Sequence, residues 1–278
     1  MATDQSIADL LAAAEEALAE AGFRTGDFAA ARAAFQQAHD AAAEAGDAVG
    51  QARALAGLGM VAHYEAILGL MDGAAVDSAD IDAEEKLFRQ ALALSAENDS
   101  AQALLGLGLV FHVLHSDWMT AMPYFWQALE LVSVPGTDAG EYLRSEVHRH
   151  VGFYFLAEDV QPGVAITHLQ ISLDLREQLG DPRRIPSGLV ALAEAELSAG
   201  HRDQAVELLT RAVAQAREAG LLPQWVKHAE KALHAAQAAP ETANAPDAES
   251  DAESDAAPDA ESEPDAAEAT GDDSPASE

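Results

Sequence analysis

The sequence predicts an all-α protein: a right-handed α-solenoid of about five helix hairpins, then a capping helix and an acidic tail that we expect to be disordered. Two observations support this fold class. Apolar and small residues recur at the spacing of one helix face, as at Leu104, Leu107, Gly108 and Phe111. In addition, 49% of the residues are apolar but only 5% are aromatic, so alanine supplies much of the core, which suits closely packed helices better than a sheet.

The clearest hairpin lies at residues 101–132, AQALLGLGLVFHVLHSDWMTAMPYFWQALELV. We expect a short break at 115–118, with Ala121, Phe125 and Ala128 on one face of the second helix. Gly108 on the first helix has no side chain, so a bulky neighbour can press against its backbone. A single hairpin cannot bury this face alone and needs neighbours of the same kind.

Such neighbours occur along the chain. The first-helix pattern recurs as LAGLGMVAHY at 55–64, LLGLGLVFHV at 104–113, HVGFYFLA at 150–157 and, more loosely, LVALAEAEL at 189–197. The partner helices repeat a small–large–small spacing, as in Ala31, Phe35 and Ala38. This pattern resembles the tetratricopeptide repeat (TPR) family over residues 7–220. The resemblance implies stacked helix hairpins with a concave groove.

We expect the repeats at about 5–46, 47–97, 98–137, 138–182 and 183–220, and the capping helix at about 222–238. Glycines end the helices of the first repeat, as C-terminal caps do. The second repeat holds an insertion at about 71–82, whose aspartates lack the spacing of a calcium-binding loop, so we expect a solvated loop. Pro223 suits the first turn of the capping helix, in which Trp225, Ala229 and Leu233 form an apolar stripe.

Residues 240–278 differ sharply from the rest because they contain no Leu, Ile, Val, Phe, Tyr or Trp, and so cannot bury apolar surface. They carry 14 of the 48 acidic residues and no basic one. The formal net charge of the chain is −33, and residues 1–239 still hold 34 acidic residues against 15 basic ones. Such a surface disfavours nucleic acid and favours basic partners, although solubility alone would also explain the charge.

Other classes are disfavoured by what the sequence lacks. It has no cysteine, and therefore no disulfide or thiolate metal site. Its first residues lack the positive region of a signal peptide, and no run of about 18 apolar residues predicts a membrane span. We therefore expect a cytoplasmic protein without a cofactor. No Ser/His/Asp or paired-carboxylate arrangement stands out, so we predict no catalytic residues and no enzymatic activity.

In the array that the resemblance implies, residues three before, one after and four after the repeated glycine position face the groove. The groove residues predicted in this way are Met60, His63, Leu105, Leu109, His112, Arg149, Phe153, Leu156, Val190 and Glu194. An apolar trough with a few polar groups suits a peptide or a helix. The alternative interpretation is that the apolar members simply pack against neighbouring helices.

We therefore predict a non-enzymatic adaptor that holds a peptide or helix of another protein, including one with basic segments, in this groove. The main alternative is a regulatory sensor that binds a small molecule or signalling peptide there. A histidine-based enzyme or metal-binding protein is a third hypothesis, for which His112 and His115 would be the first metal ligands. We favour core or groove histidines over a metal site, and we predict neither nucleic-acid nor membrane binding.

Overall fold

The computed structural model describes residues 6–95, 100–133 and 140–239; the predicted acidic tail, 240–278, lies outside the described residues. Within the described ranges the chain is all-α and contains no strand. The helices are α1 (Ile7–Glu20), α2 (Ala29–Ala45), α3 (Ala48–Met71), α4 (Ser78–Leu94), α5 (Ala101–Leu109), α6 (Trp118–Val132), α7 (Glu141–Ala157), α8 (Pro162–Leu179), α9 (Ile185–Ser198), α10 (Arg202–Glu218) and α11 (Pro223–Ala238).

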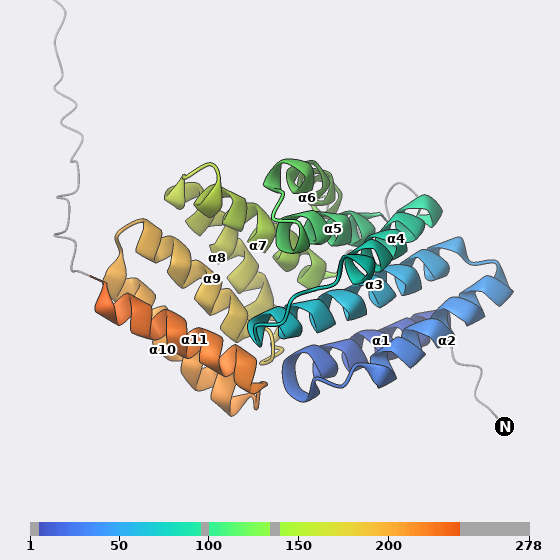
Figure 1. The fold of residues 1–278 in the computed structure, drawn as a ribbon, viewed down its shortest axis with the longest axis horizontal. Coiled ribbons are helices and arrows are strands. Elements are labelled where there is room, and N and C mark those ends of the chain that lie inside the picture. Colours follow the sequence, from blue (N-terminus) through green and yellow to red (C-terminus); the bar gives the residue numbers. More distant parts are fainter. Residues whose placement is uncertain (1–5, 96–99, 134–139, 240–278) are drawn as a thin grey trace, which may run out of the picture. The chain divides into compact units, whose positions relative to one another are not determined.

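Each helix packs chiefly against the helices that precede and follow it in the chain (Figure 1). The odd-numbered helices also contact one another in order, from α1 with α3 through to α9 with α11. The odd helices therefore form a continuous layer, and each even helix from α2 to α10 covers the odd helices beside it. All of them belong to one unit, Met1–Thr242.

Local sequence signals explain where the helices begin and end. The Ser6 hydroxyl accepts a hydrogen bond from the Asp9 backbone N–H, and the carboxylates of Asp47 and Asp117 cap α3 and α6 in the same manner. At the other end, Gly46 and Gly180 close α2 and α8 with positive φ angles of 69° and 68°. These caps satisfy backbone groups that the helix ends would otherwise leave unpaired.

Glycines on the odd helices provide the notches that the sequence predicts. Gly59, Gly108 and Gly152 are all buried. A Cβ added at Gly59 would lie 2.7 Å from the Phe88 ring, and one at Gly152 would lie 2.7 Å from Cγ of Leu169. A Cβ added at Gly108 would lie closer still to the ring of Phe125. The bulky residue of an even helix thus fits where its odd partner has no side chain.

Two short π-helical segments follow α1 and α5: η1 (Ala21–Thr25) and η3 (Val110–Leu114). The chain then breaks after η3, and α6 begins at Trp118, which agrees with the break expected near 115–118. Ser116 in this break has a φ of 55°. His112 belongs to the second of these π-helical segments.

The expected insertion at 71–82 is shorter in the structure. Helix α3 continues to Met71 and α4 begins at Ser78, because the carboxylate of Asp77 caps α4. Asp80 therefore lies on a helix rather than in a loop. Among the described residues, α3 is also the one helix long and apolar enough to cross a membrane by length and composition. Its glycines receive the rings of Phe35 and Phe88, so we interpret it as a core helix.

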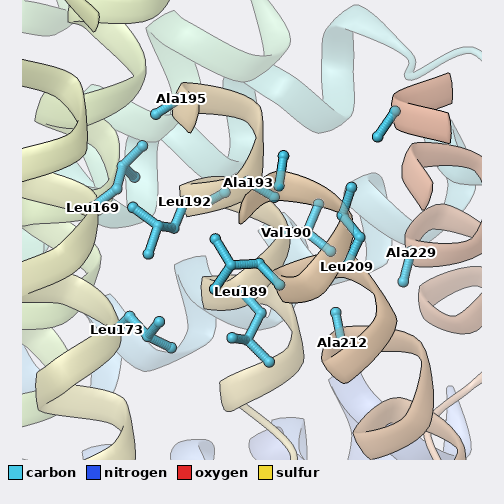
Figure 2. Close-up of a cluster of buried hydrophobic side chains, with 14 of the residues drawn as sticks. Leu169, Leu173, Leu189, Val190, Leu192, Ala193, Ala195, Leu209, Ala212 and Ala229 are labelled. Atoms are coloured by element: carbon cyan, nitrogen blue, oxygen red, sulfur yellow. The ribbon is translucent and has the colours of Figure 1, made fainter. Parts of the chain in front are cut away.

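The C-terminal helix packs on two sides. Figure 2 shows Ala229 of α11 beside the apolar cluster that Leu189 and Val190 of α9 form with the neighbouring α8 and α10. Its first turn also contacts the N-terminal hairpin: Trp225 lies 5.6 Å from Phe23 between ring centroids, and its indole Nε1 donates a hydrogen bond of 2.8 Å to the Gly22 carbonyl. The helix expected at about 222–238 thus contacts the N-terminal hairpin as well as α9 and α10.

Candidate functional site

A hollow of about 580 Å³ opens on the layer of odd helices. Its walls come from η3, α6, α7 and α9. We call this cavity the hollow. Its lining residues are His112, Trp118, Phe153, Leu156, Ala157, Glu194 and Ser198. The lining is mainly aromatic and aliphatic, and Glu194 is its one acidic group. Apolar concavities with a few polar groups are the usual form of a binding site.

His112 and Trp118 form one wall of the hollow. Their rings are stacked, with centroids 3.6 Å apart and an interplanar angle of 25°. Behind them, Nδ1 of His112 lies 3.3 Å from Nδ1 of His150. Burial, with smaller contributions from Arg149 and His63, lowers the pKa of His112 to about 3. His112 is therefore neutral at pH 7 and adds no positive charge to the wall.

Phe153 and Glu194 form the opposite part of the lining. The guanidinium of Arg149 lies 4.7 Å over the Phe153 ring, a cation–π arrangement. Glu194 is exposed and its carboxylate opens to the hollow, while the surrounding helices displace part of its water. This desolvation raises the pKa of Glu194, and the positive charge of Arg149 offsets part of the rise. Glu194 has no hydrogen bond or ion pair with the described residues.

A buried ionic network lies behind the hollow. Glu146 pairs with Arg176, and both side chains are buried. Burial alone would raise the pKa of Glu146, but the guanidinium groups of Arg176, Arg149 and Arg184 outweigh it and lower that pKa. Nδ1 of His63 lies 2.8 Å from the Glu84 carboxylate, and this pair is buried as well. Removing one partner of such a pair leaves an uncompensated buried charge. We therefore interpret these pairs as contributors to the stability of the fold rather than as binding groups.

The ten predicted groove residues fall into three groups in the structure. Four of them line the hollow: His112, Phe153, Leu156 and Glu194. Four others are buried, with exposures of 3–5%: His63, Leu105, Leu109 and Val190. The last two, Met60 and Arg149, are partly buried. Met60 packs against two apolar clusters. For Met60 and the four buried residues, the structure therefore agrees with the alternative interpretation, in which these side chains pack against neighbouring helices.

Three lining residues were not among those predicted. Ser198 lies four residues after Glu194 on α9, and so one helix turn further along the same face. Ala157 follows Leu156 at the end of α7. Extending the repeat register by one turn would have found Ser198, but nothing in the register indicates Trp118, which reaches the hollow because α6 begins immediately after the break.

A second concavity lies at the junction of α11 with the N-terminal hairpin. We call it the crevice; it has a free volume of about 20 Å³, which is room for one water molecule. Its lining includes Phe23, Arg149, Val190, Trp225 and His228. The rings of Phe23 and Trp225 pack on each other at this junction and leave little free space.

No three His, Asp or Glu side chains gather at metal-binding distance within the described ranges. The histidines proposed as first metal ligands diverge: His112 contacts His150, whereas the exposed His115 packs beside Phe111, with ring centroids 5.5 Å apart. His148 contacts His168 instead, with 3.0 Å between the two Nδ1 atoms.

No model of a known protein family matches the chain, and no curated protein matches it with significant similarity. The resemblance to the TPR family therefore depends on the residue pattern quoted above.

Proposed function

We propose that this is a non-enzymatic interaction protein whose hollow holds a short peptide segment of another protein. The observation that carries the proposal is the hollow itself. It has about 580 Å³ of open space, with side chains from α7 and α9 beside the π-helical turn η3 and the start of α6. This volume fits one or two large side chains, and a mainly apolar lining with one carboxylate suits peptide anchoring.

We also propose that the helices form TPR-like hairpins in a right-handed α-solenoid. Support comes from the glycine notches that receive Phe88, Phe125 and Leu169, and from the ordered contacts among the odd helices. In such an array the odd helices present side chains from successive repeats on one surface, as the hollow requires.

Exposed apolar side chains close in sequence to the lining residues support the proposal that a partner protein covers this surface. Met119 is 83% exposed and directly follows Trp118, while Val160 is 68% exposed and lies three residues after Ala157. Large exposed apolar side chains beside a concave site are a common mark of protein interaction surfaces. We propose that these two residues extend the contact beyond the hollow.

Binding rather than catalysis is favoured by the state of the ionisable groups. His112 is neutral, stacked on Trp118, and its Nδ1 is in contact with His150. Glu194 has no proton-donating partner among the described residues. A general acid or base acts together with a positioned partner, and this pair of groups lacks that arrangement.

Selection from a library of random short peptides tests the proposal. Peptides enriched on the full chain are synthesised and titrated against Leu156→Glu, which places a charge in the hollow. We expect affinity to fall at least about 10-fold, because an apolar contact is lost and a charge must be desolvated. The control is Leu179→Glu, since Leu179 is 43% exposed on α8 and does not line the hollow. Equal affinity for both variants would contradict the proposal.

A small-molecule sensor is the second candidate, because the volume of the hollow is within the range of small-molecule sites. The same variants separate the two. A compound library is screened for members that raise the thermal stability of the wild type and of Leu179→Glu but not of Leu156→Glu. Such a compound, together with a peptide selection that enriches nothing, would favour the sensor.

A further inference from the structure

The hollow has the features of a cation site. Two aromatic rings, Trp118 and Phe153, line it together with the carboxylate of Glu194. Aromatic rings attract cations through their negative faces, and an arginine or lysine carries an aliphatic stem that packs on such rings. The chain already shows this chemistry where Arg149 lies over Phe153 and where Arg184 lies over Tyr142.

The charge balance of the lining is also negative. Because His112 is held neutral by its lowered pKa, no side chain of the lining is positively charged at pH 7, and Glu194 is its one acidic group. Arg149 lines the crevice rather than the hollow, and Glu146 lies close enough to offset part of its charge. The chain as a whole carries −33, so the field around the hollow attracts basic segments.

Glu194 is exposed and makes no hydrogen bond or ion pair within the part of the chain that the structure describes, although the charge of Arg149 acts on it through space. A carboxylate that opens into a pocket lined by aromatic rings offers an external cation a charge-assisted contact beside those rings. Other carboxylates near the odd-helix layer are already paired: Glu84 with His63 and Glu146 with Arg176. The unpaired state of Glu194 therefore sets it apart from them.

We propose that the hollow receives a basic side chain, arginine or lysine, from the partner peptide, with its head group paired to Glu194 and its stem against Trp118 and Phe153. This inference rests on the proposed function, because the peptide is the source of the cation. The partner surface thus carries a basic residue next to apolar residues that cover Met119 and Val160.

Indole N–H signals of the full chain, recorded by nuclear magnetic resonance, provide the test. The chain has three tryptophans, so three signals are followed and assigned with Trp→Phe variants. N-acetyl-arginine amide is titrated against N-acetyl-citrulline amide, which has nearly the same shape without the charge. We expect the arginine probe to shift the Trp118 signal until the site is saturated. The citrulline probe should bind at least about 10-fold more weakly. The Trp225 signal should not move.

Two variants locate the charge. Glu194→Gln should remove the preference for arginine over citrulline, whereas Glu207→Gln, at an exposed position of α10 outside the hollow, should retain it. Equal binding of the two probes to the wild type would overturn the inference, and so would an arginine preference that survives Glu194→Gln.

Library selection separates this inference from the proposed function. Enriched peptides that depend on Leu156 and contain no basic residue would overturn the cation site while the peptide role stands. Arginine binding at Trp118 with no enriched peptide would overturn the peptide as the source of the cation, and with it the proposed function. Enriched peptides that share a basic residue, and lose affinity in Glu194→Gln, would support both.

Discussion

The same repeat position has opposite environments at the N-terminal end and in the middle of the helical array. Phe23, His112 and Leu156 each lie four residues after the repeated small residue of a first helix. Phe23 is only 4% exposed because Trp225 of α11 covers it. His112 and Leu156 instead line the open hollow. The register decides which way a side chain faces, and the segment opposite decides whether it becomes core or site.

Trp225 and Trp118 therefore form a matched pair for mutation. Trp225→Ala removes a ring packed on Phe23 and the indole hydrogen bond to Gly22, so we expect a loss of about 2 to 3 kcal/mol in the free energy of unfolding. Trp118→Ala removes a stack on His112 and should cost only about 1 kcal/mol, while abolishing binding in the hollow. Urea unfolding measures both losses. Equal losses would mean that the crevice and the hollow do not differ in role.

Glycine substitutions test the packing on which both concavities depend. Gly108→Ala places a methyl group against the Phe125 ring, and we expect about 1 to 3 kcal/mol of destabilisation. Gly163→Ala on α8 meets nothing within 4 Å, so the better helix propensity of alanine should leave stability equal or raise it by up to about 1 kcal/mol. Thermal unfolding of the two variants gives the comparison, and a neutral Gly108→Ala would contradict the notch.

Acid should destabilise the fold through the partly or fully buried histidines next to the hollow. The pKa of His112 is lowered to about 3 and that of its neighbour His150 lies well below its usual value, mainly through burial. Below pH 6.5 the unfolded chain binds protons that these native histidines do not. Stability therefore falls as the pH drops from about 6.5 toward 4, by up to about 1.4 kcal/mol per pH unit for each such histidine.

Urea midpoints measured across this range check the slope. His112→Gln should make it shallower, whereas His234→Gln, at an exposed position of α11, should leave it unchanged. A slope that does not respond to His112→Gln would show that this imidazole is not kept neutral by the fold.

The smallest expected effect concerns the ion pair at the crevice. Both terminal nitrogens of Arg183 contact the carboxylate of Glu16, at 2.7 and 2.8 Å, and Glu16 is largely exposed. Arg183→Lys keeps the charge but loses the two-point geometry, so we expect about 0.5 to 1 kcal/mol of destabilisation. Arg211→Lys, in an exposed pair with Glu177, should cost less. Calorimetry in low salt resolves the difference, and an equal cost would remove any special role of Arg183.

The helices, the break before Trp118 and the glycine notches could be predicted from the sequence, because each depends on residues close in the chain. It also placed four lining residues by register, His112 and Glu194 among them. It did not distinguish these from Leu109, which has the same register, because burial depends on which helix packs opposite. The contact between Phe23 and Trp225 joins the two ends of the array, and no local pattern reports such a pairing.

The most direct test of the account is a map of nuclear Overhauser contacts between an enriched peptide and the full chain. We expect contacts from a basic peptide side chain to the Trp118 indole and the Leu156 methyl groups, and none to Trp225. Contacts at Trp225 with none at Trp118, or a bound peptide that touches neither Trp118 nor Leu156, would contradict it.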